Sequence, residues 1–363
     1  MHPIAHPAGR AAGRPPWWSR LRRTALVGLL AAGLSASGAM ADDAPIELDV
    51  IGGLAAISQY ERLEKPFWTE QLPVLTNGRM HARIQPFDRS GIAGQEVLRL
   101  LRLGVLSYGN ILLSLAAAEE PELNAVDLAL LSPDIGTLRR TVAAWRPWME
   151  AVLRDRFGLE PLAVYTYPAQ VLFCRDPVQG LEIAGRRVRT SSVGQSELVK
   201  ALGGVPVVIP FAEINQAIRD GVVTCAITSV LAGQAINLSA QAPHVGRVGL
   251  SWGLSVFAAN QSAWQALPED LRAQLRQGIG GLERAIWDEA GRESAAVQGC
   301  DTGPTACPAG RVATPPAGQD ETRRLRLLAD TIIPRWLERC GPHCAAAWNR
   351  HMAASTGLVA EVR

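Results

Sequence analysis

The chain has 363 residues, enough for one large or two ordinary domains with a substantial hydrophobic core. Hydrophobic residues make up 48% and charged residues 19%, which excludes global disorder and a protein of many membrane spans. The formal net charge of +2 is too small to indicate a phosphate-binding surface, so we expect no nucleic-acid partner.

The first 41 residues have the pattern of a bacterial secretory signal peptide. Five arginines precede the apolar run ALVGLLAAGL (25–34), and small residues then lead to the triplet AMA (39–41). A basic region, a short apolar region and an A-x-A site are typical of a cleaved signal. Because so short a run cannot span a membrane as a helix, we expect a mature periplasmic chain that begins near Asp42. The pair Arg22-Arg23 leaves twin-arginine export open as an alternative to the general secretory route.

Removal of this segment changes the charge of the protein. Residues 1–41 contain five arginines and no acidic residue, so 31 Lys and Arg remain against 34 Asp and Glu. The formal net charge then becomes −3. The basic character of the full chain therefore comes from the signal segment, and we expect positive charge to matter only locally in the mature protein.

The cysteines agree with export to an oxidising compartment. Cys300 and Cys307 bracket a turn-rich segment, and Cys340 and Cys344 bracket Gly-Pro-His, so two local disulfides are the simplest interpretation. A metal site at the second pair would have His343 as its third clustered ligand and no fourth. We therefore expect neither a metal nor another cofactor.

Cys174 and Cys225 allow two structural interpretations and one catalytic one. They form either a third disulfide or a pair of small buried side chains, and the sequence leaves both open. A Cys-dependent periplasmic enzyme would need one of them as a nucleophile, with His244 as a base. No catalytic motif flanks either cysteine, and neither G-x-S-x-G nor H-E-x-x-H occurs, so we expect no enzyme.

Short strand-like runs alternate with amphipathic helices along the mature chain, which predicts an α/β fold. The expected strands are residues 46–52, 81–88, 108–114, 125–131, 161–175, 185–192, 205–210, 222–229 and 250–260. The expected helices are residues 58–75, 94–104, 135–158, 196–204, 211–221, 267–287 and 320–340, and we expect Pro334 to kink the last of them.

Two α/β units in one exported chain predict two lobes, with a ligand-binding cleft between them at the ends of the strands. We expect lobe I to comprise residues 42–166 and 256–299, and lobe II residues 167–255. Residues 300–363 would form a loop and long C-terminal helices that pack on the lobes. We expect a monomer.

The segment GRRVRTSSVGQSELVKALG (185–203) has the features of an anion site. In a strand over 185–190, Arg187 and Arg189 would share one face. The strand leads directly into a helix that begins near Ser191 or Ser192, so backbone N–H groups would lie beside Arg189. A guanidinium and a helix N-terminus together suit a carboxylate. The alternative is that these arginines are solvated or pair with surface acids.

Three segments closely resemble the substrate-binding proteins of tripartite ATP-independent periplasmic (TRAP) transporters, the DctP-type family. They are SGIAGQEVLRLLRLG (90–104), LEIAGRRVRTSSVGQSELVKALGGVPVVIPFAEINQAIRDGVVTCAITS (181–229) and SWGLSVFAANQSAWQALPEDLRAQL (251–275). The resemblance implies a two-lobed periplasmic-binding-protein clamshell, type II-like, that closes on an organic acid. It also implies that the protein delivers this acid to the membrane subunits of a TRAP transporter.

The resemblance places the carboxylate-binding arginine of the family at Arg189. Where sialic-acid-binding members carry a second arginine upstream, this chain has Pro-Ala-Gln, which leaves Gln170 as a neutral hydrogen-bonding candidate and argues against a sialic-acid-like ligand. On the strand that ends at residue 229, Thr224-Cys225 replaces the common Asp-Gly pair, so a polar contact is expected instead from Thr228 or Ser229.

Three further candidates have a structural alternative of equal or greater weight. Trp252 could form an apolar wall for the ligand or belong to the core. Tyr60 could contact the ligand from the first lobe or lie on a helix surface, and Asn110 follows a predicted strand. The sequence identifies neither the acid nor the role in transport, and a ligand-sensing subunit of a signalling system remains the alternative function.

Overall fold

The computed structural model of the protein describes residues 44–361 except 56, 247, 299–310 and 313–318. The predicted signal peptide and the pair Cys300 and Cys307 lie outside the described residues. Among the helices of the described part, none is both long enough and apolar enough to cross a membrane.

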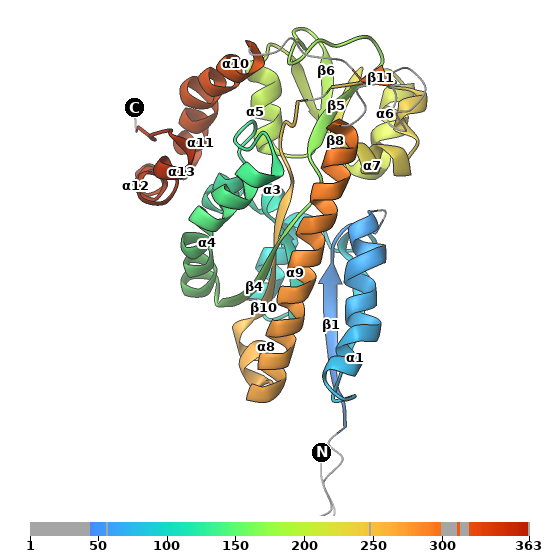
Figure 1. Ribbon diagram of the computed structural model, residues 1–363, viewed down its shortest axis with the longest axis vertical. Coiled ribbons are helices and arrows are strands. Elements are labelled where there is room, and N and C mark those ends of the chain that lie inside the picture. The colour runs from blue at the N-terminus through green and yellow to red at the C-terminus, as the bar shows by residue number, and fades with distance from the viewer. Residues whose placement is uncertain (1–43, 56, 247, 299–310, 313–318, 362–363) are drawn as a thin grey trace, which may run out of the picture. The chain divides into compact units, whose positions relative to one another are not determined.

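The described strands form two mixed sheets (Figure 1). The first has the order β2-β1-β3-β10-β4, with β1 parallel to β2 and β3, and β10 antiparallel to β3 and β4. Its strands are β1 (Ile46–Gly52), β2 (Met80–Pro86), β3 (Tyr108–Leu112), β4 (Leu159–Thr166) and β10 (Leu254–Asn260).

The second sheet has the order β11-β9-β5-β8-β6-β7. In it, β6 is parallel to both β7 and β8, whereas β5 is antiparallel to β8 and β9. Its strands are β5 (Gln170–Cys174), β6 (Arg187–Thr190), β7 (Val205–Val208), β8 (Cys225–Ser229), β9 (His244–Val245) and β11 (Arg311–Val312). The short β11 lies in the segment predicted as a loop.

Helices surround both sheets, and the two longest, α4 and α9, both pack against β4 (Figure 1). The α-helices are α1 (Leu72–Leu75), α2 (Val97–Arg102), α3 (Leu113–Ala116), α4 (Ile135–Phe157), α5 (Val193–Ala201), α6 (Ile214–Arg219), α7 (Val230–Ala235), α8 (Gln261–Ala266), α9 (Glu269–Gln298), α10 (Gln319–Leu327), α11 (Ile333–Cys340), α12 (Pro342–His351) and α13 (Ala353–Thr356).

Wider and tighter helical turns complete several of these elements. The π-helical turns are Tyr60–Glu64, Phe67–Gln71 and Leu328–Ile332, and the 3₁₀ segments are Phe87–Arg89, Gly94–Glu96, Pro121–Asp127, Phe211–Glu213 and Leu238–Ala240. With the residues between them, the first two π turns and α1 form the continuous helix predicted over 58–75. The α/β class and the long C-terminal helices are confirmed.

Two strand predictions are wrong. The single strand expected over 161–175 is two strands in different sheets, because the chain leaves β4 at Thr166, turns through Tyr167-Pro168-Ala169 and enters β5 at Gln170. The strand expected over 125–131 is instead the end of the 3₁₀ segment Pro121–Asp127 and an irregular stretch. There the carboxylate of Asp127 accepts hydrogen bonds from two backbone N–H groups that lie outside the segment.

A buried carboxylate fixes the turn after β1 to the following helix. Glu64 is 1% exposed, and its two oxygens accept hydrogen bonds from the backbone N–H of Gly53 (2.9 Å) and from the side chain of Gln59 (2.9 Å). Burial nevertheless dominates these two bonds and raises the pKa of Glu64 to about 7. The charged form of Glu64 is therefore a source of instability at neutral pH.

A disulfide joins the central strands of the second sheet. Cys174 and Cys225 form a registered pair between β5 and β8, are fully buried, and are bonded to each other across a sequence separation of 51 residues. Cys340 and Cys344 form a second disulfide with a separation of only 4 residues. The first bridge closes a much longer loop and therefore restricts the unfolded chain more.

We predict unequal losses of stability when the two bridges are removed. Chain-entropy arithmetic gives about 4 kcal/mol for the Cys174–Cys225 loop and about 2 kcal/mol for the Cys340–Cys344 loop. The double variants Cys174→Ala/Cys225→Ala and Cys340→Ala/Cys344→Ala should differ accordingly in the free energy of unfolding, measured by urea denaturation. Equal losses would contradict this assignment.

We predict a pH-dependent gain of stability for Glu64→Gln. The folded protein holds a proton on Glu64 that the unfolded chain releases above pH 4.5, so this group makes the wild type less stable as pH rises from 4.5 to about 7. The glutamine stays neutral, so the variant should gain up to about 3 kcal/mol relative to the wild type across that window.

Chemical denaturation of both proteins at pH 4.5 and pH 8 measures this change. Glu61→Gln, on the exposed side of the same helix, is the matched control and should show no comparable difference. A pH-independent difference between wild type and Glu64→Gln would refute the role of the buried carboxylate.

Candidate functional site

A cavity of about 560 Å³ lies where parallel strands of both sheets end. Leu54 and Phe87, on its wall, follow β1 and β2 of the first sheet. Arg189, Val208 and Thr228 line it from the last or the last but one residue of β6, β7 and β8 in the second sheet. Ligands of α/β proteins bind at this position because the strand ends leave a crevice between the following loops.

Arg189 is a buried cation held by the backbone of two neighbouring strands. The residue is 3% exposed. Its Nε donates to the carbonyl oxygen of Ile209, just after β7, and its Nη1 donates to that of Ile227 in β8, both at 2.8 Å. Nη2 makes no hydrogen bond within the described part of the chain. These two bonds orient the guanidinium and leave Nη2 available to a ligand.

The charge of Arg189 is poorly compensated. No described carboxylate lies within 4.0 Å of it, and burial lowers the pKa of its guanidinium from 12.5 to about 10. Among the described residues, Arg189 is the one positively charged side chain that lines the cavity. An anion that reaches Nη2 would restore the solvation that the guanidinium has lost.

Two acidic side chains also line the cavity, and each is bound to the backbone. Asp127 accepts the N–H groups of Trp252 and Gly253, both at 2.8 Å, and Asp88 accepts the N–H of Ala55 at 3.0 Å. Burial raises the pKa of Asp127 to about 6, although the backbone N–H groups oppose that rise. These acids organise the wall of the cavity rather than neutralise Arg189.

The N-terminus of α5 lies at the wall as predicted, and its polar groups bond to one another. The Ser192 side chain caps the helix by accepting the N–H of Gln195 (3.2 Å). The Gln195 side chain accepts the N–H of Ser191 (2.9 Å) and donates to the hydroxyl of Ser251 (3.1 Å). Gln195 and Ser251 are therefore wall residues that bridge two segments, and sequence reasoning missed both.

Gln170, Thr228 and Ser229 all line the cavity, at the paired ends of β5 and β8. Gln170 lies opposite Ser229 in the antiparallel register. The Ser229 side chain caps α7 by accepting the N–H of Ala232 (3.2 Å), and the Gln170 side chain donates to the carbonyl oxygen of Pro168 (3.2 Å). The structure thus brings these three predicted residues onto one wall with Arg189.

The other three predicted residues do not line this cavity. Trp252 is 2% exposed, and its indole N–H donates to the carbonyl oxygen of Ser132 (2.8 Å). Tyr60 is 4% exposed, with its hydroxyl 3.4 Å from the carbonyl oxygen of Ile84. Asn110 is buried on β3, and neither side-chain amide atom has a hydrogen-bond partner among the described residues.

Asn124 and Tyr167 also belong to the wall and were missed. Asn124 is 5% exposed, and its Oδ1 has no hydrogen-bond partner among the described residues. The sequence does contain a signal for Asn124, because Asn124 and Asp127 interrupt an otherwise apolar run. Two polar side chains in such a run argue against an ordinary buried strand. Tyr167 lies at the break between β4 and β5, a break indicated by the adjacent Pro168.

The fold matches solved structures of solute receptors. DctP7 of Bordetella pertussis, an extracytoplasmic solute receptor described as binding pyroglutamic acid, superimposes with a TM-score of 0.73 at 20% identity, covering 84% of this chain and 99% of that chain. A TRAP solute-binding protein from a marine metagenome, described as specific for pyroglutamate, gives 0.70 at 19% identity, covering 85% and 98%.

A further TRAP periplasmic solute-binding protein, from Sulfitobacter sp. NAS-14.1 with bound β-D-galacturonate, gives a TM-score of 0.70 at 15% identity, covering 84% of this chain and 99% of that chain. At these identities the similarity establishes the fold. The family model for bacterial extracellular solute-binding protein, family 7 (DctP), matches residues 58–297, which is more than half of the sequence. The chain therefore belongs to the DctP family, family 7 of the bacterial extracellular solute-binding proteins.

Proposed function

We propose that this protein is a periplasmic receptor that binds a small organic monocarboxylate and delivers it to the membrane subunits of a TRAP transporter. The observation that carries the proposal is Arg189, a buried guanidinium on the wall of a cavity whose Nη2 bonds to no described residue. A carboxylate suits a charged N–H donor that is held in a fixed orientation in a site of low dielectric.

The remaining wall favours a ligand with one charge. Most polar side chains that line the cavity already form hydrogen bonds within the protein. Among the described lining residues, Arg189 has no second positively charged side chain beside it. The apolar wall residues are Leu54, Ile57, Phe87, Ala93, Leu112, Leu115, Ala129, Val208, Ile209, Pro210, Phe211, Ala212 and Ala232. A dicarboxylate would leave its second charge against these side chains or against acids, at a desolvation cost.

Asn124 adds a second element of recognition. Its buried Oδ1 is an acceptor without a partner among the described residues, and an unpaired buried acceptor is costly. A neutral N–H or O–H donor on the ligand would satisfy it. A monocarboxylate with a lactam or amide N–H fits both groups, and pyroglutamic acid, the ligand that DctP7 is described as binding, is of this class.

Ligand delivery requires that binding change the conformation of the receptor. The chain crosses between the sheets at Tyr167–Ala169 and again at Ser251–Gly253, and the cavity is lined from both sheets. Gly253 has a φ of +79°, which favours glycine in the second crossing. A ligand that contacts both walls would stabilise the closed arrangement, and the two crossings are the natural hinges.

A Cys-dependent enzyme is disfavoured by one observation. Cys174 and Cys225, the two candidate nucleophiles, are bonded to each other and fully buried. A disulfide sulfur is not a thiolate and cannot initiate covalent catalysis in this state.

We predict that Arg189→Gln lowers the affinity for the carboxylate ligand by about 100-fold or more, because the buried anion loses its charged partner. Isothermal titration calorimetry of both proteins with pyroglutamate, or with the acid that a thermal-shift screen identifies, measures the change. Arg187→Gln is the matched control, since Arg187 is an exposed residue of the same strand. Wild-type affinity in Arg189→Gln would refute the assignment.

We predict that a set of related compounds separates the contribution of Arg189 to ligand binding from that of Asn124. Pyroglutamate should stabilise the folded protein by about 2.7 kcal/mol at 100 times its Kd. 2-Pyrrolidone, which lacks the carboxylate, should give no thermal shift, and cyclopentanecarboxylate, which lacks the lactam, should give a smaller one. Equal shifts from 2-pyrrolidone and pyroglutamate would contradict a site organised around Arg189.

A further inference from the structure

The junction between α11 and α12 brings together three metal-binding side chains. Cys340 ends α11, Gly341 turns the chain with a φ of +87°, and His343 and Cys344 lie in the first turn of α12. The ligand atoms of Cys340, His343 and Cys344 lie within 4.8 Å of one another, and the two sulfurs form a disulfide. His343 Nε2 is 3.3 Å from the sulfur of Cys344.

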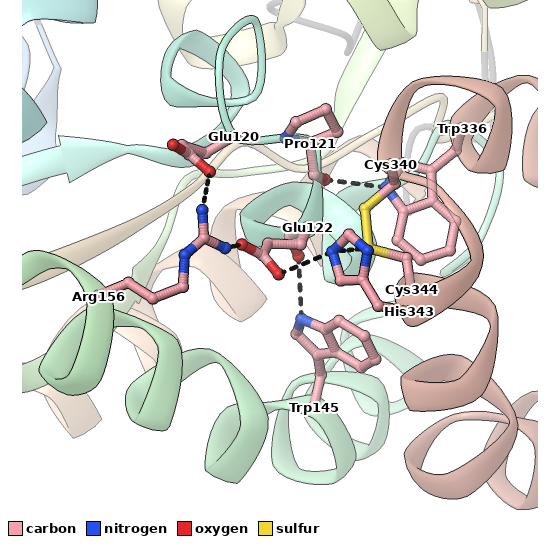
Figure 2. Close-up of a disulfide and its surroundings, with 9 residues drawn as sticks. All are labelled: Glu120, Pro121, Glu122, Trp145, Arg156, Trp336, Cys340, His343 and Cys344. Atoms are coloured by element: carbon pink, nitrogen blue, oxygen red, sulfur yellow. Dashed lines mark hydrogen bonds and ion pairs between the residues drawn. A yellow bond between two sulfur atoms is a disulfide. The ribbon is translucent and has the colours of Figure 1, made fainter.

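A fourth group reaches this corner from a distant part of the sequence. Glu122, in the 3₁₀ segment Pro121–Asp127, directs Oε2 toward His343 Nε2 at 3.5 Å (Figure 2). Its side chain is 3% exposed, and Oε2 has no hydrogen-bond partner among the described residues. The other oxygen is bound by Arg156, which fixes the orientation of the carboxylate. This carboxylate is the candidate for the fourth ligand that the local sequence lacked: it approaches His343, and it would have to move closer to the two sulfurs, because it lies outside the 4.8 Å cluster of Cys340, His343 and Cys344.

We propose that the reduced form of this corner is a Zn²⁺ site made by Cys340, His343, Cys344 and Glu122. Two thiolates, an imidazole and a carboxylate form a donor set that suits tetrahedral zinc. At zinc–ligand bond lengths of about 2.0–2.3 Å, neighbouring ligand atoms lie about 3.3–3.8 Å apart. The distances from Nε2 to the Cys344 sulfur and to Oε2 already fall in this range.

The disulfide controls the site because bonded sulfurs cannot act as thiolate ligands. A dithiol or phosphine reductant breaks the S–S bond by supplying two electrons, and two protons convert the sulfurs to thiols. Zinc then displaces both thiol protons, and the two sulfurs separate to about 3.8 Å. The oxidised form retains only His343 and Glu122 as ligands, too few for a stable site. His343 is 56% exposed and provides a route for the ion.

Zinc would also join parts of the protein that the disulfide does not link. The disulfide connects α11 to α12 alone, whereas Glu122 belongs to the segment that carries Asn124 and Asp127 to the cavity. A Zn²⁺ ion held by both sides would therefore fix the C-terminal helices to the cavity wall.

The test compares zinc binding by the oxidised and the reduced protein. The purified protein carries Cys300→Ser and Cys307→Ser, so that thiols outside the described residues contribute no ligands. After treatment with a phosphine reductant and gel filtration in the presence of Zn²⁺, bound zinc is measured by elemental analysis. We expect one zinc per reduced chain with a Kd below about 1 μM, and none in the oxidised protein.

Variants of each ligand make the test specific. Cys340→Ser/Cys344→Ser, His343→Ala and Glu122→Gln should each lose the zinc, whereas His81→Ala, which alters an exposed histidine on β2, should retain it. Co²⁺ in place of zinc should show thiolate charge-transfer and tetrahedral absorption bands in the reduced protein only. Circular dichroism confirms that each variant is folded.

Three outcomes would overturn the proposal. They are no zinc in the reduced protein, equal zinc in the oxidised protein, and full zinc binding by the reduced Cys340→Ser/Cys344→Ser variant. The last of these variants retains the thiols of Cys174 and Cys225, so it separates this corner from the other pair. None of these outcomes bears on carboxylate binding at Arg189, which is measured separately.

Discussion

The burial of one positive charge at the end of three parallel strands, β7, β6 and β8, is the constraint on which the site depends. Arg189 can be buried because β6 lies between β7 and β8, so that the carbonyl oxygens of Ile209 and Ile227 flank its guanidinium. Two backbone dipoles compensate a full charge only in part. The sheet therefore holds a cation in a fixed orientation whose remaining solvation must come from the cavity, and this requirement is the physical basis for the anionic ligand that we propose.

A second buried charge connects the walls of the cavity. Asp127 ends the 3₁₀ segment Pro121–Asp127, and its two oxygens accept the backbone N–H groups of Trp252 and Gly253, where the chain crosses from the second sheet back to the first. One carboxylate thus ties the wall of the cavity to the crossing that we propose as a hinge. Its partners are backbone groups, so the contact fixes the position of the crossing strand without restricting which side chains face the ligand.

The predictable part of the site is the part determined by local sequence. Alternation in RRVRT predicts β6, and the serines that follow predict the cap of α5, so Arg189 could be located at a strand end from neighbouring residues alone. The same reasoning failed at residues 161–175, because a run of apolar residues has the same pattern whether it forms one long strand or two short ones. Only Pro168 marks the point at which the chain changes sheets.

Residues whose positions depend on distant partners could not be placed from sequence. Trp252 lies in the core because its indole N–H bonds to Ser132, 120 residues away, and a buried aromatic side chain carries the same local signal whether it faces a ligand or the core. Asn124 is similar, since its exposure to the cavity follows from the 3₁₀ segment rather than from any periodic pattern. Long-range contacts decide which polar residues become wall residues.

The C-terminal helices show how a part of the chain beyond the family match supports the site. The match ends at residue 297, yet the indole N–H of Trp336 in α11 donates to the carbonyl oxygen of Pro121 at 2.8 Å, and that of Trp145 donates to Glu122 at 3.2 Å (Figure 2). Both bonds satisfy backbone carbonyls of the 3₁₀ segment. Short 3₁₀ segments have weak internal hydrogen bonds. The indoles from α4 and α11 therefore hold from outside the segment that carries Asn124 and Asp127 to the cavity wall, so a helix beyond the family match helps to fix that wall.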